Sequence, residues 1–317
     1  MEPTYPNIVA ACPQASLNPD TQRPVAKKRV YDVLREDCYD ESAEEPWKHK
    51  ARYSKTALPA PMMEKRLAFA KHVETWKHTA AWFYTNVVWT DICNSILPRS
   101  EKKASEQALA RKGKRGWMSP GCEMFSANLA GKKESLKQNS WDCVRIWWAP
   151  VLTQGKLHVV VFDDGFPGET GEGAKLLVEK LRAAINVRCQ GAARQPKYVF
   201  VDRGKGFYTP ASGQITSKYS VALAENNFEP MMGQNARLQP GSLSEVLLHE
   251  TAVSWLRVRL AESVPARAWA ETREQYASRL RACCQAVNSC YNVDGLCRAF
   301  PGRIAQLREA QGGKLKQ

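Results

Sequence analysis

Two stretches of the sequence each run from an apolar segment directly into an aspartate. Residues 87–90 (VVWT) precede Asp91, and residues 197–201 (KYVFV) precede Asp202. Valine, threonine and aromatic residues favour a half-buried pleated backbone, and short runs of this kind are typical of central strands. Because an unpaired buried carboxylate is costly, each aspartate should lie at a strand end, hydrogen-bonded or beside a cation. Two strands that deliver acids to one rim of a sheet predict a metal-binding pair, although aspartate also suits turns that bind nothing.

The overall charge favours a polyanionic partner. The chain has 46 lysines and arginines against 32 aspartates and glutamates, a net charge of +14. Such a surplus points to nucleic acid, although a merely basic surface would also give it. A segment with glycines and a tryptophan concentrates this charge at Lys112, Lys114 and Arg115. It suits phosphate contact with a base stacked on the ring, and it equally suits a flexible, solvated insertion.

The composition excludes a membrane protein and disfavours a disulfide scaffold. At 317 residues and 44% hydrophobic content the chain can form one large globular domain or two. No run approaches the roughly 18 apolar residues of a membrane helix, and the start has no signal-peptide pattern. We therefore expect the ten cysteines to be thiols in a reducing compartment. Four of them cluster at 283–297 without the paired spacing of a zinc site, which favours buried thiols.

Periodicity predicts an α/β domain with helical extensions. We expect a disordered, proline-rich lead over residues 1–27, a helical segment over 28–80, the α/β domain over 81–264 and a helical tail over 265–317. The individual elements expected are, in order, a helix at 62–76, strands at 87–90, 143–148 and 157–162, a helix at 173–187, a strand at 197–201, a helix at 212–227, a loop at 230–242 and a helix at 247–260.

This order of elements is that of a ribonuclease-H-like fold, an α/β fold with a mixed five-stranded sheet flanked by helices. In sequence the chain resembles the transposases of the mariner superfamily, including its Tc-type branch. Four segments between about residue 28 and residue 317 carry the likeness: RLAFAKH through VVWTD (66–91), VRIW with GK and DG (144–165), VFVD (199–202), and LCR with PGRI and GGK (296–314). The resemblance implies that residues 30–35 are the remnant of a second DNA-binding helix-turn-helix.

The resemblance also implies a catalytic site. Asp91 and Asp202 take the places of the family's first two acids, and Glu250, which begins a helix, takes the place of the third; Glu245 remains the alternative. Three such acids hold two Mg²⁺ or Mn²⁺ ions, with Asp202 bridging both, and displacement at phosphorus then needs no Ser, Cys or His nucleophile. The implied partners are double-stranded DNA, as transposon ends and target, and a second copy in a homodimer, in the nucleus and without a membrane.

The chain departs from the family pattern beside both aspartates. Ile92 follows the first where the family has Glu, and Phe207 stands where a His follows the second. Arg203 and Lys205 are new cations that we expect to contact DNA or to pair with the acids in place of a metal. Two functions therefore remain open, a metal-dependent transposase and a non-catalytic DNA-binding descendant. A nuclease acting on RNA–DNA hybrids shares the fold and metals but has no support from the flanking motifs.

Overall fold

The computed structural model describes residues 48–51, 58–105, 115–118, 143–188, 195–209 and 212–315. The expected lead, the helix at 30–35, Lys112 and Lys114 lie outside these residues. Residues 58–104 and the described residues from 143 onward belong to one compact unit. A separate unit contains the antiparallel pair β1 (Lys48–Ala51) and β4 (Arg115–Met118), in which Arg115 is placed opposite Ala51.

The compact unit is built on a mixed sheet with strand order β3-β5-β2-β7-β8, with β6 paired to β5. The contacts of β5 with β2, β3 and β6 are antiparallel, and β7 lies parallel to both β2 and β8. The strands are β2 (Val87–Thr90), β3 (Cys93–Pro98), β5 (Cys143–Thr153), β6 (Lys156–Val161), β7 (Tyr198–Phe200) and β8 (Glu229–Pro230).

The expectation of five strands is wrong in number, because the first strand is interrupted. Thr90 pairs with Val151 and Cys93 pairs with Trp148, so β2 and β3 continue one another in a single register along β5. Pro150 lies opposite the interruption and has no N–H to offer, and its carbonyl accepts the Thr90 hydroxyl at 2.6 Å. The pairing therefore stops at the position of Asp91, and the described part of the sheet has six strands.

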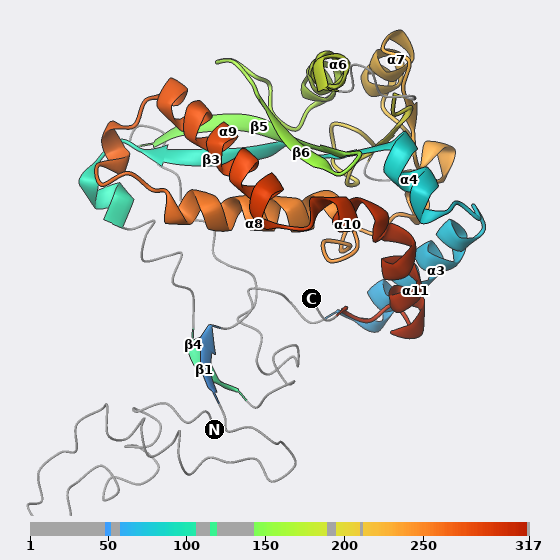
Figure 1. The fold of residues 1–317 in the computed structure, drawn as a ribbon. Coiled ribbons are helices and arrows are strands. Elements are labelled where there is room, and N and C mark those ends of the chain that lie inside the picture. The colour runs from blue at the N-terminus through green and yellow to red at the C-terminus, as the bar shows by residue number, and fades with distance from the viewer. Residues whose placement is uncertain are drawn as a thin grey trace, which may run out of the picture. The chain divides into compact units, whose positions relative to one another are not determined.

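Helices cover both faces of this sheet. In Figure 1, α6 and α7 lie on one side of it and α8 on the other, and α9 crosses β6 and packs against α8. The helices are α3 (Ala60–Glu74), α4 (Ala80–Asn86), α6 (Gly171–Arg188), α7 (Ser217–Glu225), α8 (Leu248–Glu262), α9 (Arg273–Cys290), α10 (Val293–Arg298) and α11 (Phe300–Glu309), with 3₁₀ turns η3 (Gly233–Leu238) and η4 (Ala268–Ala270). No helix in the described parts of the chain is both long enough and apolar enough to cross a membrane.

Two expectations between β7 and α8 need correction. The helix predicted at 212–227 begins only at Ser217, because Ile215 forms an isolated antiparallel bridge with Tyr208 and keeps the preceding residues extended. The loop predicted at 230–242 contains the 3₁₀ turn η3. Gly213 lies against this turn with φ of +65°, and a Cβ there would stand 2.7 Å from the Arg237 backbone. A tight approach of two backbones thus replaces the expected helical turn.

Aromatic packing fixes the C-terminal helices to the centre of the sheet. Trp89 and Phe200, on adjacent strands, stack at 4.6 Å, and Phe300 at the start of α11 lies 4.7 Å from Trp89. All three side chains are fully buried. Because the two stacked rings come two residues before Asp91 and Asp202, this packing holds the ends of both acid-bearing strands.

A buried arginine ties α3 to the C-terminal tail. Arg66 is fully buried, and its guanidinium donates to the carbonyls of Gly312 at 2.7 Å and Gly313 at 2.8 Å and to the carboxylate of Glu245 at 2.5 Å. Gly312 has φ of +78°, and a Cβ there would stand 1.9 Å from the Met63 carbonyl oxygen. We call these residues the Arg66 clamp. Two of the segments that carry the family resemblance, at 66 and at 312, are therefore bonded to each other.

Candidate active site

The two aspartates emerge side by side from adjacent parallel strands. Val88 is opposite Val199 and Trp89 is opposite Phe200, so Asp91 and Asp202 each follow the paired residues by two positions. Adjacent strands lie about 4.8 Å apart, which brings the two acids to one rim of the sheet. Each carboxylate accepts a hydrogen bond from the next backbone N–H, from Ile92 at 2.8 Å and from Arg203 at 2.6 Å. The strand pattern in the sequence correctly indicated this juxtaposition.

The first turn of α8 brings a third carboxylate to Asp91. One ligand atom each from Asp91, His249 and Glu250 lie within 4.8 Å of one another. The helix begins at Leu248, so Glu250 lies in its first turn, where the partial positive charge of the helix end favours a carboxylate. Three potential metal ligands thus converge from a strand end and a helix start that are about 160 residues apart in the sequence.

Glu245, the alternative third acid, is engaged elsewhere. Its carboxylate is fully buried, lies 2.5 Å from the Arg66 guanidinium and 3.9 Å from the Lys314 ammonium, and belongs to the Arg66 clamp. Burial alone would raise its pKa, but the hydrogen bond and charge of Arg66 outweigh burial and lower it. The geometry therefore gives Glu245 a structural role and places Glu250, not Glu245, against Asp91.

Asp91 is electrostatically crowded. Burial raises its pKa to about 8; the charges of Asp202, Glu250 and Glu169 add to the rise, and the hydrogen bond from Ile92 opposes it. Burial likewise raises the pKa of Asp202 against the hydrogen bond from Arg203. Carboxylates that repel one another in a poorly solvated place favour either protons or a bound cation. The site has the electrostatics of a cation site.

The two cations that were expected to replace a metal, Arg203 and Lys205, are not the main influences on the pKa of Asp91. The charged groups that act most strongly on Asp91 are carboxylates, and neither Arg203 nor Lys205 is among them. Lys205 is exposed. Phe207, at the family's histidine position, is buried with its ring 5.0 Å from Tyr219, so it belongs to the core under α7. A histidine introduced at 207 would enter this packing rather than a metal site.

Sequence reasoning missed His249. Its side chain is 1% exposed, and neither ring nitrogen has a hydrogen-bond partner. Burial lowers its pKa to about 3, so the imidazole is neutral. The five histidines are scattered in the sequence, so their positions alone did not indicate a site. Successive side chains on a helix point about 100° apart, so the fact that His249 directly precedes Glu250 gave no reason to expect the two side chains at one site. Glu169, just before α6, was missed as well, because no strand or helix pattern singles it out.

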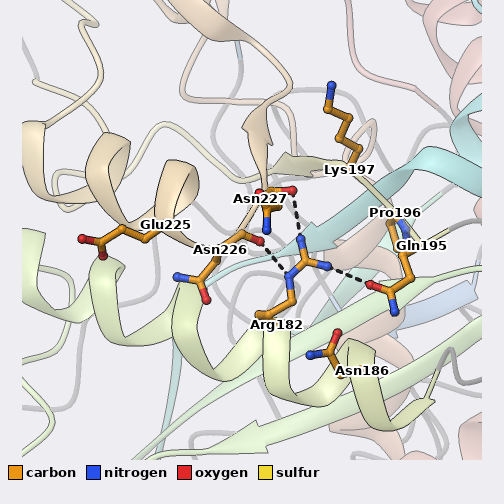
Figure 2. Close-up of a pocket in the computed structure, with 8 residues that line it drawn as sticks. All are labelled: Arg182, Asn186, Gln195, Pro196, Lys197, Glu225, Asn226 and Asn227. Carbon is orange, nitrogen blue, oxygen red and sulfur yellow. Dashed lines mark hydrogen bonds between the residues drawn. The ribbon is translucent and has the colours of Figure 1, made fainter.

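One polar surface pocket among the described residues lies away from the acids. Figure 2 shows a polar pocket of about 560 Å³ around Arg182, near the start of β7 and therefore at the end opposite Asp202. The Arg182 guanidinium donates to the carbonyls of Asn226 at 2.7 Å and Asn227 at 2.9 Å, and to the Gln195 side chain at 3.1 Å. The arginine thereby satisfies carbonyls just beyond the end of α7, which is a structural task.

Comparison with known proteins supports the fold. No protein-family model matches the sequence, and no curated protein matches it significantly. Among solved structures, the chain is similar to a pre-cleavage Mos1 transpososome (TM-score 0.54, 11% identity, 92% of this chain and 72% of that one). It is also similar to the Mos1 strand transfer complex (TM-score 0.53) and to the Mos1 mariner paired-end complex with Mn (TM-score 0.51). In both comparisons the identity is 12%, and the match covers 92% of this chain and 72% of the other. At such low identity the likeness shows that the chain has this fold, a mixed sheet flanked by helices.

Proposed function

We propose that this chain is a mariner-like transposase that cleaves and rejoins DNA phosphodiesters with divalent metal ions on a ribonuclease-H-like scaffold. The observation that carries the proposal is the convergence of Asp91 and Glu250, with ligand atoms within 4.8 Å, at the rim where β7 delivers Asp202. The likeness in fold to Mos1 complexes supports it, since those proteins are described with transposon ends and with Mn or Mg. The proposed catalytic region spans residues 81–264.

The donor set fits a divalent metal. Burial and, after it, the charges of neighbouring carboxylates raise the pKa of Asp91, and the imidazole of His249 is buried with both nitrogens unsatisfied. Buried polar groups without a partner are rare, and the binding of an ion is one of the few explanations for them. The residues present therefore suit Mg²⁺ or Mn²⁺ at Asp91 and Glu250, with Asp202 supplying the further carboxylate of a two-metal arrangement.

The geometry suggests a different division of roles from the one implied by the family resemblance. Asp91 has a ligand atom within 4.8 Å of one from Glu250, and its strand runs parallel to and beside the strand that leads to Asp202. Asp91 is therefore near both other acids, and we propose it as the shared ligand in place of Asp202. Divalent ions held by these acids would supply activation of the attacking oxygen and stabilisation of the leaving one for in-line displacement at phosphorus. The backbone N–H groups of Ile92 and Arg203 hold the two aspartates in place for this task.

DNA binding would rest on the basic surplus. The net charge of +14 favours a polyanion, and Lys112, Lys114, Arg115, Arg203 and Lys205 are the proposed phosphate contacts. A homodimer and a nuclear location belong to the same proposal, because a transposase must bring two DNA ends together and reach chromosomal DNA.

A plasmid-nicking assay tests the proposal. Purified protein with supercoiled plasmid and Mn²⁺ should produce nicked circles, and Asp202→Ala should lower the rate at least about 100-fold, since changes only around metal ligands already cost 10–100-fold. Asp163→Ala is the matched control, because Asp163 follows another strand, β6, but its side chain is 92% exposed. It should nick as the wild type does.

The competing function has its own signature. Ile92 and Phe207 depart from the family motif and are both core residues, which favours a descendant that keeps only the scaffold. Salt-dependent DNA binding without any nicking by the wild type would identify a non-catalytic DNA-binding protein. Nicking that is equal in wild type and Asp202→Ala would reject the proposed site and point to a contaminating nuclease.

A further inference from the structure

The buried histidine beside the acids has no structural explanation among the described residues. His249 follows the first residue of α8, is 1% exposed, and donates and accepts no hydrogen bond at either nitrogen. A histidine that served packing alone would be expected to bond at least one ring nitrogen to a carbonyl, hydroxyl or water. The ring is therefore buried with both nitrogens free of hydrogen bonds.

The same histidine lies beside two acids of the site. One of its nitrogens lies within 4.8 Å of carboxylate oxygens of both Asp91 and Glu250. Two ligand atoms that each lie about 2.2 Å from one ion can be no more than about 4.4 Å apart, so a small adjustment of side chains would let all three reach one ion.

We propose that His249 is a direct metal ligand, so that Asp91, His249 and Glu250 form a mixed nitrogen and oxygen site that prefers a divalent transition-metal ion such as Mn²⁺ to Mg²⁺. This inference rests on the proposed function and deepens it by naming the ion class. Mg²⁺ takes oxygen ligands and gives up its water reluctantly, whereas first-row transition ions accept imidazole readily. In an all-carboxylate site, removal of the imidazole would not weaken Mn²⁺ binding more than Mg²⁺ binding.

The test detects directly whether a histidine nitrogen is bound to the metal ion. The full chain is freed of metal with a chelator, loaded with Mn²⁺ alone and examined by pulsed electron paramagnetic resonance, which detects ¹⁴N bound to the ion. The wild type should show the modulation of a coordinated imidazole nitrogen. His249→Leu, which keeps an apolar side chain in the buried position, should lose it. His72→Leu is the matched control, because the Nε2 of His72 on α3 is also buried and unpartnered but does not belong to the acid group.

Affinity gives a second readout. His249→Leu should weaken Mn²⁺ binding about 10-fold or more, while Mg²⁺ binding should change less than about 3-fold. Both are measured by titration calorimetry at one pH. If His249→Leu does not fold, His249→Asn keeps a polar side chain without an imidazole and should lose the nitrogen signal in the same way.

The outcomes separate the inference from the proposed function. Mn²⁺ that binds the wild type, is lost in Glu250→Gln and shows no nitrogen coupling would overturn the role of His249 and leave the carboxylate site standing. Equal Mn²⁺ affinity in wild type and His249→Leu would do the same. A wild type that binds neither ion would overturn both.

Discussion

At the scale of single residues, Asp91 should limit the stability of the metal-free protein. Its pKa is raised from 3.8 to about 8 in the folded state, so the folded chain holds a proton that the unfolded chain releases over that interval. Stability therefore falls as pH rises from about 4 to about 8. Asp91→Asn cannot ionise and should avoid this loss, so its stability advantage over the wild type should grow by at least about 1 kcal/mol between pH 5 and pH 9.

Urea unfolding in chelator at pH 5, 7 and 9 measures this difference, with Asp163→Asn as the exposed control. With excess Mn²⁺ the order should reverse, because only the wild type gains binding free energy. A constant difference at all three pH values would mean that the pKa of Asp91 is not raised in the folded protein.

The residues of the site were partly predictable from the sequence. Asp91 and Asp202 each end a short β-prone run, and a parallel register is enough to bring two such ends together. The sequence could not decide between Glu245 and Glu250, because the distinction depends on Arg66, which is 179 positions from Glu245. His249 was not predicted, because the neighbouring sequence does not show whether a histidine on a helix has hydrogen-bond partners.

At the scale of elements, the Arg66 clamp should be a principal tie between α3, the segment before α8 and the tail. Arg66→Met leaves the Glu245 carboxylate buried without its main partner and should cost about 3–5 kcal/mol of unfolding free energy. The double variant Arg66→Met, Glu245→Met removes both charges and should recover much of that loss. Urea unfolding of the two single variants and the double variant at pH 7 gives the comparison. A double variant as unstable as the sum of the singles would show that the two side chains act independently.

Acid should weaken the same clamp. The pKa of Glu245 lies below its ordinary 4.5 in the folded protein, so the ion pair contributes stability above pH 4.5 that is lost as pH falls through the lowered folded pKa. The stability advantage of the wild type over Glu245→Gln should therefore be constant from pH 7 to about 5 and shrink below about 4. An advantage that persists unchanged at pH 3 would assign the stabilisation to packing rather than charge.

The elements themselves were mostly predictable, since α3, β2, α6, β7 and α8 follow the expected periodicity to within a few residues. The exceptions have tertiary causes. The stop at Asp91 depends on Pro150 in the neighbouring strand, and the late start of α7 depends on the Tyr208–Ile215 bridge. Neither partner can be identified from local pattern.

At the scale of the whole molecule, the basic surplus should govern DNA affinity. Replacing Lys112, Lys114 and Arg115 together by alanine should flatten the slope of log K against log salt by about 0.9 for each phosphate that the protein no longer neutralises, up to about 2.7. Fluorescence anisotropy with a labelled duplex at several salt concentrations measures the slope. Alanine at Lys180, Lys197 and Lys218, each near an acidic side chain, removes equal charge as a control and should change the slope less. Equal slopes for both triple variants would mean that charge alone matters, not the segment around Lys112.

The overall architecture followed from the order of elements and from the four segments resembling mariner transposases, and the likeness in fold to Mos1 complexes agrees with it. What the sequence left open is how segments distant in the chain meet. Arg66 and Gly312 are 246 positions apart, yet they bond directly. Such contacts are decided by the packing of the whole domain and have no local signature.

The most direct test of the metal site is anomalous diffraction from crystals of the full chain grown or soaked with Mn²⁺. We predict a manganese peak in contact with the carboxylates of Asp91 and Glu250, on the side of the rim where Asp202 lies, at metal–oxygen distances of about 2.0–2.5 Å. The peak should disappear in Asp91→Asn crystals grown in the same way. No peak at this position in the wild type at saturating Mn²⁺, or a peak held only by residues outside this group, would contradict the proposed active site.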